Sequence, residues 1–171
     1  MSGGTGTVTG RCPPNAPELG SGAGTAFHRT TELPLGCLPT SPACARAHAD
    51  AVLHEWGLAH LADDAVMIVS ELTTNAYDAS AIWPDKPPMA LRLSADDTRL
   101  LIEVWDHSPD DPAPAGADAD SEIGRGLTIV DALAARWGVE HHADRLKAVW
   151  AEMEIPGPRS STHKTASIVE H

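Results

Sequence analysis

The sequence has few cysteines, few basic residues and no long apolar run, and each shortage excludes a class of protein. No run approaches the ~20 consecutive apolar residues of a membrane-spanning helix. Lys and Arg number 12 against 24 Asp and Glu, so the net charge of -12 repels nucleic acid and anionic membranes. The three cysteines have no CxxC spacing, and the first residues lack a signal-peptide pattern. We therefore expect a soluble, cytoplasmic protein without nucleic-acid or membrane partners.

Motifs of several common enzyme classes are also missing. The sequence has no GxSxG of a hydrolase and no HExxH of a zinc enzyme, and Gly124-Arg125-Gly126 lacks the third glycine of a dinucleotide site. The nine histidines show no zinc-ligand spacing. The composition, 42% hydrophobic and 21% charged, is that of a globular domain. The fold is therefore predicted from the pattern of expected helices and strands.

Composition divides the chain into three parts. Residues 1–25 are mostly Gly, Thr, Pro and Ser, with little apolar surface to bury, which predicts a disordered leader. Residues 156–171 have a similar composition and are expected to form a disordered tail. The folded unit is then 26–155, the size of one domain.

Periodicity within this unit predicts an α+β fold. Apolar residues recur at three- and four-residue steps in 60–80, the clearest helix, and helices are also expected in 41–56 and 126–137. Expected strands are 27–35, closed by Pro34, and 89–95, 100–106, 137–142 and 146–155. This order predicts a two-layer α/β sandwich, with the helices on one face of a mixed, mostly antiparallel sheet.

One face of the 60–80 helix carries a polar pair. Glu71 and Asn75 are four residues apart, so they project from the same side, and Asp64 and Asp78 extend the stripe. The Asn oxygen suits a hard cation such as Mg²⁺, and Glu71 suits proton abstraction from a water or hydroxyl. A solvated polar face is the alternative interpretation.

Two further sites follow along the chain. Asp106 ends a strand just before Ser108-Pro109, and Gly124-Arg125-Gly126 opens a helix after the acidic, Pro-rich loop 107–123. Glycines at a helix N-terminus let phosphate oxygens approach backbone N–H groups. A loop of this length is usually functional or disordered.

The segments SELTTNA, VWDHSP, GRGLTIVDALAARWG and KAVWAEM, in this order, resemble the ATP-binding domain of the GHKL superfamily. Within it the chain is similar to the anti-sigma-factor serine/threonine kinase family in its actinobacterial form. The resemblance covers about residues 40–154. It implies the Bergerat ATP-binding fold.

The resemblance also implies a role for each matching residue. Asn75 would coordinate a Mg²⁺ ion that bridges the ATP phosphates, Glu71 would be the catalytic base, and Asp106 would accept a hydrogen bond from the adenine amino group. The 107–123 loop would close over the triphosphate as a lid, and Arg125 is either a phosphate contact or an exposed charge. The remaining residues implied to bind ATP are Pro109, Gly124, Gly126 and Leu127.

Three departures from the family pattern bear on function. Asp78 replaces an often basic residue, Ala79 a usual histidine, and Ala148 a hydroxyl residue, so an adenine contact at position 148 is in doubt. Two functions therefore remain open. One is a kinase that phosphorylates an anti-anti-sigma partner on Ser or Thr. The other is a non-catalytic, ATP-dependent or nucleotide-independent interaction module with a degenerate site. The expected partners are a sigma factor or an anti-anti-sigma-like regulator, with a homodimer as a further option.

Overall fold

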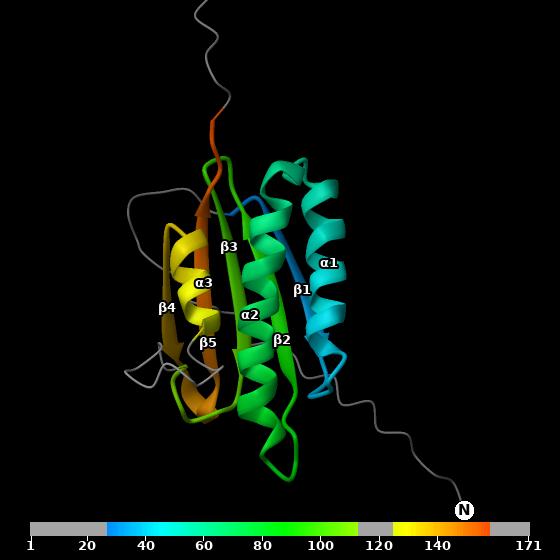
Figure 1. Ribbon diagram of the computed structural model, residues 1–171, viewed down its shortest axis with the longest axis vertical. Coiled ribbons are helices and arrows are strands. Elements are labelled where there is room, and N and C mark those ends of the chain that lie inside the picture. The colour runs from blue at the N-terminus through cyan, green and yellow to red at the C-terminus, as the bar shows by residue number, and fades with distance from the viewer. Residues whose placement is uncertain (1–26, 113–124, 158–171) are drawn as a thin grey trace, which may run out of the picture.

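A five-stranded antiparallel sheet is the framework of the protein (Figure 1). The structure is a computed structural model and describes residues 27–112 and 125–157. The strands lie in the order β1-β2-β3-β5-β4, and each neighbouring pair is antiparallel, where a mixed, mostly antiparallel sheet was expected. Their bounds are β1 Arg29–Leu35, β2 Met89–Ala95, β3 Arg99–Asp106, β4 Arg136–His141 and β5 Lys147–Glu154.

The α-helices among the described residues are α1 (Ser41–Glu55), α2 (Ala62–Ala81) and α3 (Arg125–Leu133). Pro42 lies in the first turn of α1, where its missing N–H costs no hydrogen bond. The chain leaves α1 through Gly57, whose φ of 74° is a left-handed conformation that glycine adopts without strain. The helices expected at 41–56 and 60–80 are confirmed to within a few residues. A short 3-10 turn, residues 59–61, precedes α2.

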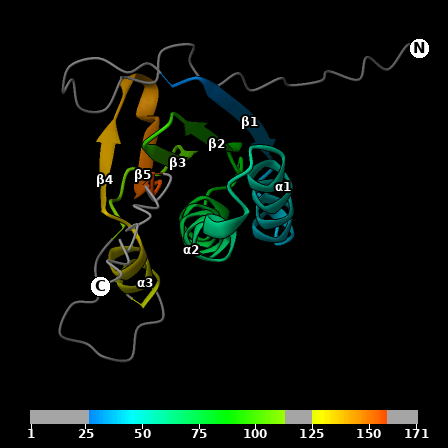
Figure 2. The same ribbon diagram turned by 90° about the horizontal axis from the view of Figure 1, so that it is seen from above.

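The helices form a second layer on one face of the sheet, as the view from above shows (Figure 2). Alternate strand residues such as Leu91, Leu93 and Ile102 project towards this layer, and they meet Ile68 and Leu72 of α2. Burying one such side chain fully stabilises the fold by about 1.5–3 kcal/mol. The two-layer α+β sandwich predicted from the sequence is confirmed.

The helix expected over 126–137 is too long. It ends at Leu133, and Arg136 already begins β4. The chain leaves the helix because the Ala135 N–H donates to the carbonyl of Glu152 on β5, at 2.8 Å. The Arg136 guanidinium then donates twice to the Glu152 carboxylate, at 3.0 and 2.8 Å. These cross-strand contacts override a sequence that remains helical in its apolar spacing.

The strand expected over 27–35 is confirmed as β1, which starts two residues later and runs through Pro34 to Leu35. Pro34 pairs with Ala90 in β2. β1 is at the edge of the sheet. A proline in an edge strand removes no donor that a further strand would need.

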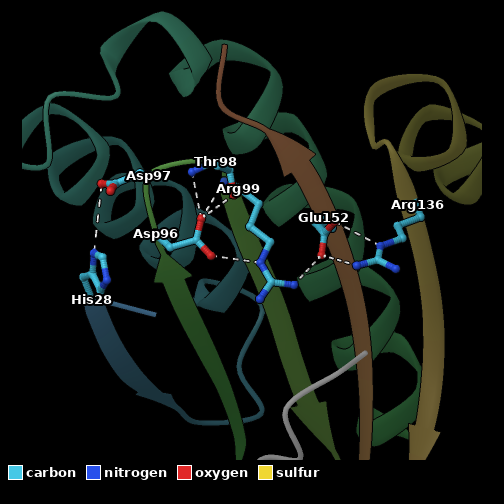
Figure 3. Close-up of polar contacts among 7 residues, drawn as sticks. All are labelled: His28, Asp96, Asp97, Thr98, Arg99, Arg136 and Glu152. Carbon is cyan, nitrogen blue, oxygen red and sulfur yellow. Dashed lines mark hydrogen bonds and ion pairs between the residues drawn. The ribbon is translucent and has the colours of Figure 1, made fainter. Parts of the chain in front are cut away.

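A polar cluster ties the β2-β3 turn to the far edge of the sheet (Figure 3). Asp96 accepts hydrogen bonds from the backbone N–H groups of Thr98 and Arg99, at 2.8 and 3.0 Å. Burial works to raise the pKa of Asp96, but these bonds and the contact with Arg99 outweigh it, so the pKa is lowered. Arg99 also lies 3.5 Å from Glu152, which pairs with Arg136 on β4.

The leader expected over 1–25 and nearly all of the tail expected over 156–171 lie outside the described residues, as does most of the 107–123 loop. In the part of the chain that is described, no helix has the length and apolar character to cross a membrane.

Candidate functional site

A cavity of about 320 Å³ lies between the C-terminal half of α2 and the ends of β3 and β5. α2 packs against both strands, which leaves the hollow where the helix passes the strand ends. The residues that line it are Asn75, Ala76, Asp78, Ala79, Ile82, Asp106, Asp110, Asp111, Pro112, Lys147 and Val149.

The walls of the cavity are largely apolar. Ala76, Ala79 and Ile82 come from α2 and the residue after it, and Val149 comes from β5. Small-molecule sites commonly combine such walls with a few polar groups that fix the orientation of the ligand. The cavity therefore combines apolar walls with a few polar groups at defined positions.

Asp106 is a buried carboxylate of the cavity and is 1% exposed. It lies at the end of β3, where its Oδ1 accepts a hydrogen bond from the Ser108 N–H at 2.7 Å. The ammonium group of Lys147, on the neighbouring strand, is 3.5 Å from the same oxygen. Within the described residues both contacts use Oδ1, so Oδ2 remains available to a ligand.

Asn75 and Asp78 contribute polar groups from α2. Asn75 is half-buried, and its Nδ2 has no hydrogen-bond partner in the described part of the chain. Asp78 is exposed, but partial burial raises the pKa of its carboxyl group above the ordinary value of 3.8. Both residues line the cavity, so the polar stripe predicted on this helix reaches it at its C-terminal end.

Glu71, one helical turn earlier, lines a different hollow. This second depression, about 390 Å³, lies between α1, α2 and α3, and Arg46, Ser70 and Ile129 also line it. Glu71 abuts the start of α3, because a Cβ atom built on Gly126 would lie 2.5 Å from Glu71 Oε2. Glycine is needed at 126 for this close approach. The structure thus separates Glu71 from the cavity that Asn75 lines.

The other residues implied by the sequence take different positions. Pro109 is exposed in the turn after Ser108 and does not line the cavity. Leu127 is 1% exposed and belongs to the hydrophobic core. Arg125 begins α3, and Gly124 lies outside the described residues.

Ala148 faces away from the cavity. Its side chain packs with Ala90 and Trp105 on the sheet face opposite the helices. The replacement of a hydroxyl side chain by alanine at 148 therefore leaves the walls of the cavity unchanged, contrary to the concern raised by the sequence.

Lys147 is the residue of this site to which the sequence analysis gave no role. The alternation of side chains along the strand could have marked Lys147 in the sequence. It shares a face with Val149, Ala151 and Met153, which are core residues. A charged residue at a core position needs a buried partner. Asp106 lies directly opposite in the β3-β5 register and meets this need.

Residues 38–152 match the family model of a histidine kinase-like ATPase domain. This chain belongs to the histidine kinase-like ATPase domain family. The match spans about two thirds of the chain, from before α1 into β5, and includes all the residues that line the cavity. No curated protein sequence matches the chain. The resemblance is thereby confirmed for the GHKL superfamily of ATP-binding domains, and the histidine kinase-like domain is of nucleotide-binding type.

Proposed function

We propose that this protein is an ATP-binding regulatory protein of the anti-sigma-factor kinase type, with the adenine of ATP in the cavity beside Asp106. The observation that carries the proposal is the buried Asp106 carboxylate between apolar walls. A carboxylate oxygen accepts the exocyclic N–H of adenine, whereas the keto oxygen of guanine has no proton to donate there. The cavity would therefore select adenine.

The Mg²⁺ ion would be held together with the nucleotide. No group of three or more His, Cys, Asp or Glu residues within 27–112 and 125–157 is arranged to hold a metal by itself. The Asn75 carboxamide, with an amide nitrogen that finds no protein partner among those residues, fits a role at the phosphate end of the site. When bound, Mg²⁺ would neutralise phosphate charge near Asp78.

Transfer of the γ-phosphate would use Glu71. In that step a serine or threonine oxygen of a partner forms a bond to the γ-phosphorus, and the bond to the bridging oxygen of ADP breaks. The Glu71 carboxylate accepts the hydroxyl proton. Its position against Gly126 at the start of α3 supports this role, because a helix N-terminus stabilises phosphate charge. An anti-anti-sigma-like regulator is the proposed acceptor.

A non-catalytic module is the second candidate function. Glu71 and Asn75 line separate hollows, and Asp78, Asp110 and Asp111 add negative charge to the nucleotide cavity. Both observations favour binding of a nucleotide without efficient transfer of its phosphate. In this case ATP would order a surface for a partner, such as a sigma factor or a second copy of the chain.

Calorimetric titration of the full chain with ATP, with and without Mg²⁺, tests the proposal. We expect binding that depends on Mg²⁺ and that falls about tenfold or more in Asn75→Ala, because a metal ligand is removed. Glu55→Ala, at an exposed position at the end of α1, is the control and should bind as the wild type does. No binding at millimolar ATP would reject the proposal.

A further inference from the structure

The ammonium group of Lys147 is buried where a strand meets the cavity. Lys147 is 2% exposed, although lysine is almost never fully buried without partners. It begins β5 and stands opposite Asp106 on β3 in the sheet register. A cation in this position has to be compensated by nearby acceptors.

Three acceptors surround the ammonium nitrogen. Lys147 Nζ donates to Ser108 Oγ at 2.6 Å and to the Asp110 carbonyl at 2.5 Å, and it lies 3.5 Å from Asp106 Oδ1. A lysine ammonium has three N–H donors. The two hydrogen bonds and the ion pair with Asp106 thus direct the ammonium group at protein acceptors rather than at a phosphate of the nucleotide.

We infer that Lys147 is a positioning residue for adenine recognition, which holds the Asp106 carboxylate and the turn over 108–110 in one arrangement. This inference rests on the proposed function. Lys147 and the Ser108 N–H both engage Oδ1, which fixes the rotation of the carboxylate and directs Oδ2 to the ligand. The contacts to Ser108 and Asp110 fix the segment that forms one wall of the cavity.

The alternative role, a lysine that binds phosphate directly, makes a different prediction. A phosphate ligand contributes to ATP binding and leaves adenosine binding unchanged. A residue that orients Asp106 contributes equally to the affinities for adenosine and ATP, because both ligands carry the base. It contributes less to GTP, because the keto group of guanine makes no donor contact with Asp106.

The experiment compares Lys147→Met with the wild type for ATP by calorimetry, and for adenosine and GTP by competition. We expect the affinities for adenosine and ATP to fall by the same factor, about tenfold or more, and the preference for ATP over GTP to shrink. Lys86→Met is the matched control, since Lys86 is exposed in the loop after α2 and should change none of these values.

Each other outcome overturns the inference. Unchanged adenosine binding, a loss confined to ATP, or an equal loss for ATP and GTP would contradict a positioning role. If Lys147→Met does not fold, Ser108→Ala removes one anchor of the turn and keeps the charge pair, and the same comparison of the three ligands decides. If the wild type binds ATP but neither variant shows these effects, only this inference is rejected. A wild type without ATP binding rejects the proposed function as well.

Discussion

At the scale of single residues, the cavity gathers four carboxylates around apolar walls and pairs only the buried one with lysine. Asp106 meets Lys147, whereas Asp78 and Asp110 remain exposed at the rim. Asp111 lies 2.7 Å from His141 on β4. In the proposed function the paired carboxylate would recognise the base, and the rim carboxylates would repel the triphosphate. This division yields two predictions about individual side chains.

Asp78→Asn should strengthen ATP binding about threefold to tenfold, because it removes a negative charge from the lining of the cavity proposed to hold ATP. Adenosine binding should not change. Burial raises the pKa of Asp78, so lowering the pH protonates it and relieves the repulsion in the wild type but not in the variant. Calorimetry at two pH values measures both effects, with exposed Asp85→Asn as the control. Weaker ATP binding in Asp78→Asn would mean that this carboxylate helps to hold the metal.

Glu71→Gln should leave ATP affinity within about twofold and lower γ-phosphate transfer by about a hundredfold or more, as expected for a lost general base. Gly126→Ala should also slow transfer, because its methyl group would displace the Glu71 carboxylate, which lies 2.5 Å from that position. Transfer of labelled phosphate to the proposed acceptor, an anti-anti-sigma-like regulator, is the measurement. Gly157→Ala, with open space around its Cβ position, is the control. Normal transfer in Glu71→Gln would reject Glu71 as the base, whereas no transfer by the wild type would leave the non-catalytic module.

At the scale of elements, the close contact between β4 and β5 depends on a glycine. A Cβ atom on Gly138 would lie 2.8 Å from Cζ2 of Trp150, its register partner on β5. We expect Gly138→Ala to lower the free energy of unfolding by about 1–3 kcal/mol, because the indole must move. Urea denaturation measures the loss, and near-UV circular dichroism reports the ring. Equal stability of Gly138→Ala and Gly157→Ala would show that the indole moves without cost.

The local sequence pattern was sufficient to predict most helices and strands. The strand at 89–95 was predicted with its observed bounds, because its alternation lies between clear turn signals. The end of α3 was not predictable in the same way. Ala134 and Ala135 favour helix, and only the hydrogen bond to Glu152, distant in sequence, ends it. The failure is a case of tertiary contacts that override local propensity.

The site was predictable to the extent that motifs mark it. Asn75 and Asp106 were selected from the sequence, and both line the cavity. Leu127 was included because the family resemblance implies that it binds ATP, but it is a core residue. Lys147 received no role because its partners, Ser108 and Asp110, come from a segment about 40 residues away that only the sheet register brings close.

At the scale of the whole molecule, the helix-free face of the sheet contains a buried acid. Glu103 on β3 is 2% exposed, and burial raises its pKa from 4.5 to about 7. Arg92 opposes this shift, and Glu140 and Glu32 add to it. The folded state therefore holds a proton between pH 4.5 and about 7 that the unfolded chain has lost, so stability falls as the pH rises through this range.

Glu103→Gln should remove this dependence. The free energy of unfolding of Glu103→Gln minus that of the wild type should increase by about 2 kcal/mol between pH 5 and pH 8. The reason is that the uncharged amide avoids the cost of a buried carboxylate. Urea denaturation at the two pH values measures the change. Glu154→Gln, an exposed position on β5, should show no such rise. A constant difference between Glu103→Gln and the wild type would contradict the predicted titration.

The central claim is that Asp106 reads adenine in the cavity between α2 and the ends of β3 and β5. The most direct measurement compares the dissociation constants of ATP and GTP, in the presence of Mg²⁺, for the wild type and Asp106→Asn. The account predicts that the wild type prefers ATP about tenfold or more and that the variant loses this preference, because an amide can donate to the keto oxygen of guanine. Equal binding of ATP and GTP by the wild type, or an unchanged preference in Asp106→Asn, would contradict it.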